Sequence, residues 1–176
     1  MERKINFIQI EKDNDAHFEM ASKLWIPFIK EVNAHDGTCQ SEKQIVDGLK
    51  KRISIQGCRK DMHFEIARIN EDPFGIAMFA IDLGTVYGLL EKGCGTIMGF
   101  YIHPKFRRKG LGTSFSKHIE ATLYSDGARK MYICPDSVTG EPFWKSNGYI
   151  DSGKIDPDDK KPIYIKDITD SIEFIN

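Results

Sequence analysis

The hydrophobic periodicity of this chain changes near residue 60, and that change limits the folds open to it. Residues 14–33 and 41–57 repeat apolar side chains every three or four positions, as amphipathic helices do. From residue 62 onward the pattern is that of strands separated by turn signals, over 62–69, 74–82 and 95–103. The second and third of these segments are apolar on both faces, which is typical of central strands. Together the two patterns predict a mixed α/β fold.

Local signals refine the two helical stretches. Pro27 lies inside the first and predicts a kink or a split there. Ser41 and Gln44 have the spacing of a capping box, so the second helix should begin beside them. The segment NAHDGT, residues 33–38, is predicted to be the loop between the two helices.

The rest of the chain alternates between the two patterns, after a short opening strand, INFIQI. The later predictions are a helix at 110–124, a strand at 130–134, a short helix at 142–147 and a last strand at 162–168. We expect a central, mixed, strongly twisted sheet with helices on both faces. Strands 74–82 and 95–103 should be antiparallel neighbours, because the connection between them is short enough for a hairpin.

The composition is that of an ordinary globular protein. Of the 176 residues, 40% are hydrophobic and 29% are charged, and the formal net charge is −1. This length suffices for one domain with a buried core, and the charge does not predict attraction to nucleic acid or to an acidic membrane. The sequence shows no signal-peptide pattern and no membrane span, so we expect a cytoplasmic protein. We expect reduced thiols and no metal site, because no CxxC pair occurs among the cysteines, Cys39, Cys58, Cys94 and Cys134.

The stretch HPKFRRKGLGT, residues 103–113, gathers four cationic side chains and two glycines between a predicted strand and a predicted helix. The first turn of a helix has unpaired N–H groups and a positive dipole, and glycines let an anion approach that backbone closely. The arrangement is typical of a phosphate or pyrophosphate site. The alternatives are a solvated basic face and ordinary glycines at a helix start. The Walker phosphate loop and the GxGxxG dinucleotide motif are both absent.

The remaining pattern is Arg-x-x-Gly-x-Gly, formed by Arg107, Gly110 and Gly112. The segment FYIHPKFRRKGLGTSFSKHIE resembles the acetyl-coenzyme A motif of the GNAT N-acetyltransferases, and GEPFWKSNGY resembles a later helix motif of that family. The order of elements is also similar. The resemblance implies a single GNAT domain over residues 1–176, an α/β (α+β) fold with a mostly antiparallel sheet. It implies acetyl transfer from acetyl-CoA to a primary amine by direct attack in a ternary complex. The alternative is an acyl-CoA-binding module with little or no turnover.

In that family the pyrophosphate lies on the backbone of the motif, and the pantetheine arm pairs with the preceding strand. The resemblance assigns the pyrophosphate to Arg107, Arg108, Lys109, Gly110, Leu111, Gly112 and Thr113. It assigns the pantetheine to Phe100, Tyr101 and Ile102, with Gly99 marking a bulge or close approach in the same strand. Two further cofactor contacts depart from the family pattern: Ser137 replaces an asparagine, and Trp144 replaces a tyrosine that protonates the leaving thiolate. An indole N–H is a donor only and is not a useful acid.

Candidate groups for proton transfer follow from their positions. Asp136, just past the fifth strand, is a candidate base for the acceptor ammonium, with Glu65 as the alternative, and Tyr101 or Tyr132 is a candidate acid. Candidate acceptor contacts are His35, Asp36 and Glu65. Each has a structural alternative, such as the turn chemistry of Asp36-Gly37. We expect a small-molecule or peptide amine as acceptor, no nucleic acid or membrane partner, and a monomer or homodimer. The sequence leaves the identity of the amine open.

Overall fold

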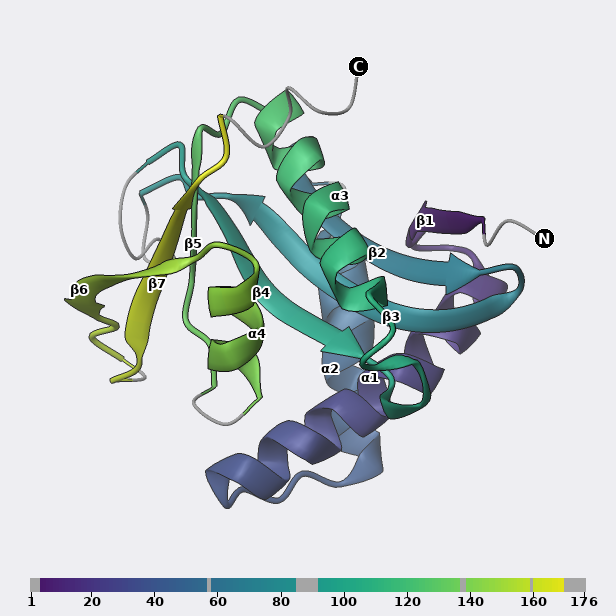
Figure 1. The fold of residues 1–176 in the computed structure, drawn as a ribbon. Coiled ribbons are helices and arrows are strands. Elements are labelled where there is room, and N and C mark those ends of the chain that lie inside the picture. Colours follow the sequence, from purple (N-terminus) through teal and green to yellow (C-terminus); the bar gives the residue numbers. More distant parts are fainter. Residues whose placement is uncertain (1–3, 57, 85–91, 137–138, 159, 170–176) are drawn as a thin grey trace. The chain divides into compact units, whose positions relative to one another are not determined.

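A computed structural model describes residues 4–56, 58–84, 92–136, 139–158 and 160–169 of the chain (Figure 1). The elements are β1 (Ile5–Gln9), α1 (Asp15–Asp36), α2 (Glu42–Ile55), β2 (Met62–Ile69), β3 (Asp72–Ile81), β4 (Gly95–Ile102), the 3-10 turn η1 (Pro104–Phe106), α3 (Leu111–Ser125), β5 (Lys130–Ile133), α4 (Gly140–Ser146), β6 (Ile150–Ile155) and β7 (Pro162–Asp167). Within the described ranges, no helix has the length and apolar character needed to cross a membrane.

The strands form one seven-stranded sheet in the order β1-β2-β3-β4-β5-β7-β6. β4 and β5 are parallel, whereas β1 pairs with β2, and β7 with both β5 and β6, in antiparallel fashion. The start of β3 bonds the end of β4, through His103 N–H to Phe74 O at 2.8 Å. The end of β3 bonds the start of β4, through Asp82 N–H to Cys94 O at 2.7 Å. The predicted mixed sheet and the antiparallel pairing of β3 and β4 are therefore confirmed.

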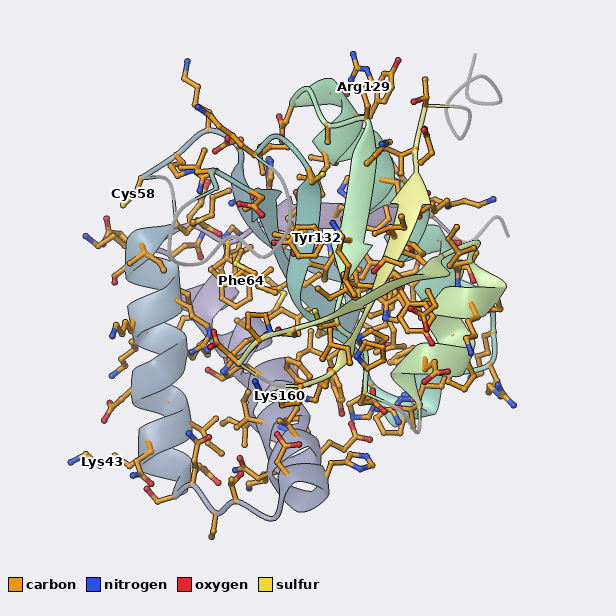
Figure 2. All side chains as sticks on the ribbon, turned by 90° about the vertical axis from the view of Figure 1, so that its left-hand side faces the viewer. Lys43, Cys58, Phe64, Arg129, Tyr132 and Lys160 are labelled. Atoms are coloured by element: carbon orange, nitrogen blue, oxygen red, sulfur yellow. The ribbon has the colours of Figure 1, made fainter. Side chains whose placement is uncertain are left out.

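The chain divides into two compact units, residues 1–78 with 99–115, and residues 79–98 with 116–176. In the first unit, apolar residues of α1 and α2 pack on one face of the strands around Trp25, Leu49 and Phe64. The rings of Trp25 and Phe64 meet edge to face at 5.4 Å, and Figure 2 shows Phe64 inside the protein. Burial of these apolar side chains is the main reason why α1 and α2 form, because their intrinsic helix propensities are moderate.

The opposite face of the same strands is covered by the start of α3. Phe115 is fully buried there, and the centre of its ring lies 5.4 Å from that of Phe7 and 5.5 Å from that of Phe100. Helices therefore cover both faces of the strands within this unit, as the sequence predicts.

In the second unit, α3 packs so closely on β4 and β5 that Gly95 has no room for a side chain. A Cβ at Gly95 would lie 2.9 Å from both Leu123 and Met131. Farther along, the ammonium of Lys166 in β7 binds both oxygens of the buried Glu120 carboxylate, at 2.7 and 2.9 Å. Burying these charges together avoids the large cost of burying either alone.

Details of α1, β4, β6 and η1 differ from the sequence predictions. α1 continues to Asp36 and ends at Gly37, whose φ of 65° allows a left-handed cap, so residues 33–36 are helical rather than loop. Pro27 lies inside this helix without splitting it. β4 was predicted to be a central strand that is apolar on both faces. One of its faces is partly open to solvent, since Met98 is 49% exposed. The sequence reading also missed β6 and η1.

Candidate functional site

The end of β4 leads into a tightly wound turn, η1. The His103 imidazole accepts the Lys105 N–H at 3.3 Å, and the His103 carbonyl accepts the Phe106 N–H at 2.8 Å. Pro104 occupies the first turn, where its fixed φ fits and its missing N–H costs nothing. This turn leads directly from the end of β4 to the basic loop, residues 107–110.

The backbone of the basic loop passes through two left-handed residues before α3 begins. Arg108 and Gly110 have φ values of 60° and 77°, in the left-handed region. Arg107, just before them, is extended, with φ −66° and ψ 159°. The first hydrogen bond within α3 runs from Ser114 N–H to Gly110 O at 3.0 Å. At the start of an α-helix the first N–H groups, here those of residues 111–113, have no carbonyl partner within the helix.

The cations of the loop differ in what they contact. Arg108 is exposed, and Lys105 and Lys109 flank the Phe106 ring, with their ammonium nitrogens 5.4 and 5.9 Å from its centre. Arg107 instead points inward. Its Nε donates to the Ile102 carbonyl at 2.7 Å, and its Nη2 donates to the Glu31 carboxylate at 2.7 Å. The hydrogen bond to Glu31 raises the pKa of Arg107 above its ordinary value. Glu31 is a site residue that the sequence analysis missed, because its partner is 76 positions away along the chain.

The strand residues assigned to the pantetheine lie at the C-terminal end of β4. Tyr101 and Ile102 are buried, and Phe100 is half-buried. The Tyr101 ring stacks on Phe28 of α1 at 5.4 Å, with the Arg107 guanidinium 5.4 Å from its centre. Burial raises the pKa of Tyr101, and the Glu31 carboxylate raises it further, so the hydroxyl stays protonated at neutral pH. The close approach at Gly99 is to α1, since a Cβ there would lie 3.4 Å from the Phe28 ring.

The candidate groups of the second unit are largely occupied. The Asp136 carboxylate accepts the N–H groups of Thr139 at 2.7 Å and Gly140 at 2.9 Å, so it holds the start of α4. The Tyr132 hydroxyl donates to Asp82. Trp144 is buried, with the Phe143 and Tyr149 rings edge-on at 4.9 and 5.1 Å. Ser137 lies outside the described residues.

The three candidate acceptor contacts do not come together. His35 and Asp36 are exposed in the last turn of α1. Glu65 is buried on β2, where it alternates with Phe64 and therefore points to the face opposite α1 and α2. There its carboxylate lies 3.8 Å from the His63 imidazole. Among the described residues, no group of three or more His, Cys, Asp or Glu side chains is placed to hold a metal ion.

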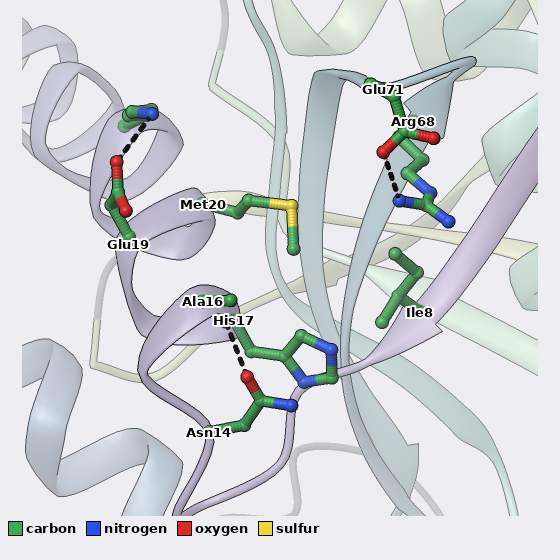
Figure 3. Close-up of a pocket in the computed structure, with 9 residues that line it drawn as sticks. Ile8, Asn14, Ala16, His17, Glu19, Met20, Arg68 and Glu71 are labelled. Atoms are coloured by element: carbon green, nitrogen blue, oxygen red, sulfur yellow. Dashed lines mark hydrogen bonds and ion pairs between the residues drawn. The ribbon is translucent and has the colours of Figure 1, made fainter.

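An open groove of about 540 Å³ lies elsewhere in the first unit, between the start of α1, β1 and the end of β2 (Figure 3). Its charged walls are paired with each other, Arg68 with Glu71 at 3.0 Å and Lys23 with Glu19 at 2.9 Å. It contains none of the residues singled out in the sequence, and we assign no ligand to it.

Comparisons with known proteins identify the family of this chain. A model of the acetyltransferase (GNAT) family matches residues 29–149, which include β4, the basic loop, α3 and α4. The chain belongs to the GNAT acetyltransferase family. Comparison with curated proteins finds no matching relative of this GNAT protein.

Solved structures share its fold at low sequence identity. The PaiA N-acetyltransferase from Thermoplasma acidophilum, in complex with coenzyme A, has 15% identity and a TM-score of 0.67 over 93% of this chain and 99% of that one. The aminoglycoside acetyltransferase AAC(6')-Ib, in complex with coenzyme A, has 15% identity and a TM-score of 0.70 over 97% and 99%. The ribosomal-protein-S18-alanine N-acetyltransferase from Escherichia coli has 14% identity and a TM-score of 0.57 over 92% and 91%. These likenesses confirm the predicted GNAT fold.

Proposed function

We propose that this protein transfers an acetyl group from acetyl-CoA to a primary amine by direct attack in a ternary complex. The observation that carries the proposal is the basic loop, which passes through left-handed residues at Arg108 and Gly110 straight into the first turn of α3. Fixed N–H groups and the positive end of the helix dipole favour a pyrophosphate there. Family membership supports acetyl transfer as the reaction.

The pantetheine arm would follow the end of β4, at Phe100 to Ile102. Because the Ile102 carbonyl already accepts the Arg107 side chain, we expect the backbone of Phe100 and Tyr101 to supply the main contacts. The thioester would then lie beyond the end of this strand.

In the reaction, the lone pair of a neutral amine attacks the thioester carbonyl. The new C–N bond forms, the C–S bond breaks, and the coenzyme A thiolate leaves. The amine gives up a proton and the thiolate takes one. The Asp136 carboxylate, the candidate base, is already engaged by two backbone N–H groups. Of the two candidate acids, the Tyr132 hydroxyl already donates to Asp82, whereas Tyr101 stays protonated and can donate. Tyr101 is therefore the preferred candidate for the acid.

The acceptor class can be approached through relatives of the same fold. Their names include an aminoglycoside acetyltransferase and a ribosomal-protein-S18-alanine N-acetyltransferase, which suggest small amines and amines of a protein or peptide as acceptor classes. We propose an acceptor from one of these two classes.

A second candidate function is binding of an acyl-CoA without turnover. The observation that favours it is Trp144, a buried indole at the position where the resemblance expects a tyrosine acid.

The test combines calorimetric titration with coenzyme A and a turnover assay that follows release of its free thiol. The acceptor panel contains a diamine, an amino acid, an aminoglycoside, a lysine peptide and a peptide with a free N-terminus, with an amine-free control for hydrolysis. Turnover with any amine above that control supports the enzyme. Binding of coenzyme A with no turnover across the panel supports the binding module, and failure to bind coenzyme A contradicts both.

A further inference from the structure

The Arg107 side chain, at the start of the basic loop, folds back onto the end of β4. Its Nε donates to the carbonyl of Ile102, five positions earlier, so the turn between strand and loop is clamped at both ends. Its Nη2 donates to Glu31 on α1, and its Cζ lies 5.4 Å from the centre of the Tyr101 ring. One guanidinium therefore ties together the end of β4, the loop and the helix α1.

These contacts leave Arg107 poorly placed to bind a phosphate itself. A guanidinium is a planar fork, and here two of its N–H directions are committed at 2.7 Å to protein oxygens. The side chains of Arg107 and Glu31 are 36% and 42% exposed, so the pair is partly shielded from water and salt. The Arg107 side chain thus supports the conformation of the basic loop.

The Glu31 carboxylate holds the Arg107 guanidinium in this position. Without its carboxylate, the guanidinium would lose the 2.7 Å hydrogen bond from Nη2 and the negative charge that it pairs with. The left-handed conformation at Arg108 costs free energy for a residue with a Cβ, so the loop needs such support to keep it. A loop that is already ordered loses less entropy when it binds an anion.

We propose that Glu31 is a positioning residue for coenzyme A binding, which acts through Arg107 to hold the basic loop in its anion-binding shape. This inference rests on the proposed function, since it assumes that the loop receives the cofactor's pyrophosphate.

The experiment is a double-mutant cycle with Glu31→Gln, Arg107→Ala and the double variant, read by calorimetric titration with coenzyme A. We expect Glu31→Gln to weaken binding about two- to fivefold, the usual effect of one partly exposed charge pair. Arg107→Ala should weaken it about tenfold or more, because it removes the hydrogen bonds to Ile102 and to Glu31 together. The double variant should bind no more weakly than Arg107→Ala, since Glu31 works through Arg107.

Two further variants separate positioning from bulk charge and from general stability. Arg107→Lys keeps the charge but lacks the fork, so it should bind about as weakly as Arg107→Ala. Glu19→Gln removes an exposed carboxylate from the same helix, where it pairs with Lys23, and should bind like the parent protein. In steady-state assays with an active amine, Glu31→Gln should raise the KM for acetyl-CoA and leave the KM for the amine unchanged.

The outcomes are distinct. If Glu31→Gln binds coenzyme A as well as the parent or more tightly, Glu31 does not support the loop, and the inference is wrong. Additive losses in the double variant, or full affinity in Arg107→Lys, contradict it equally. If the parent protein itself does not bind coenzyme A, the proposed function fails instead.

Discussion

The hydroxyl of Tyr132 in β5 donates a 2.9 Å hydrogen bond to the carboxylate of Asp82, which lies 50 positions earlier, just past β3. Both side chains are buried, and the second Asp82 oxygen accepts the Gly84 N–H at 2.6 Å. This pair joins the ends of two strands of the second unit.

Tyr132→Phe should therefore destabilise the protein by about 1–3 kcal/mol, because it leaves a buried carboxylate oxygen without this donor. The free energy of unfolding from a urea titration measures the loss. Tyr124→Phe is the control, since it removes a hydroxyl from a half-buried ring that stacks under Arg129 and should change stability little. If Tyr132→Phe is as stable as the parent yet loses turnover, the hydroxyl has a catalytic role rather than a structural one.

Phe115→Ala should cost about 3–5 kcal/mol, the usual range for removing a fully buried aromatic side chain. The ring is inaccessible to solvent and contacts aromatic rings from three strands, so the surrounding structure has little freedom to collapse onto the cavity. Denaturant titration measures the change, with Lys117→Ala, an exposed position on the same helix, as the control. A loss well below 1 kcal/mol would contradict the burial described here.

Tyr149 should make the protein sensitive to high pH. Burial raises the pKa of its hydroxyl well above the ordinary value, and the nearby Glu120 carboxylate raises it further. In the unfolded chain the group ionises near ~10. A raised pKa in the folded state stabilises the protein fully below that pH, and the contribution is lost as the pH rises toward the folded pKa.

We therefore expect the free energy of unfolding to fall above about pH 10. Tyr149→Phe removes the titrating group, so its stability should fall less steeply over the same range. Urea titrations at several alkaline pH values measure both slopes. Equal slopes for the two proteins would show that Tyr149 does not ionise on unfolding.

The sequence predicted the elements whose signals are local. β2 was predicted with its observed bounds, and the Ser41–Gln44 capping box forms as expected, with the Gln44 side chain bonding the Ser41 N–H at 2.8 Å. Periods of 3.6 and 2 identify faces, and Phe115 and Ile119 are buried as the α3 stripe requires.

The remaining features depend on contacts that no local pattern encodes. β6 was missed because its side chains are mostly exposed and its register with β7 shifts between Asp151 and Lys154, so no alternation is visible. The inward turn of Arg107 depends on Glu31, far away in the chain. A basic residue in a glycine-rich loop looks the same in sequence whether its side chain faces an anionic ligand or a carboxylate of the protein itself.

The basic loop gives the most direct test of the cofactor site. Gly112 is the second residue of α3 and is not among the described glycines with positive φ, so a side chain there adds no left-handed strain. Gly112→Asp would place a carboxylate at the first turn of the helix, where the pyrophosphate is proposed to lie. It should abolish coenzyme A binding, through steric clash and like-charge repulsion, and leave the fold intact. Calorimetric titration at two salt concentrations measures binding, and thermal unfolding checks the fold.

Gly48→Asp is the matched control, because it puts the same side chain in α2, with its Cβ 3.5 Å from Arg52. Exposed Arg108 should contribute a salt-sensitive share, so Arg108→Gly should weaken binding mainly at low salt while suiting the left-handed backbone. If Gly112→Asp binds coenzyme A as tightly as Gly48→Asp does, the pyrophosphate does not lie on the start of α3.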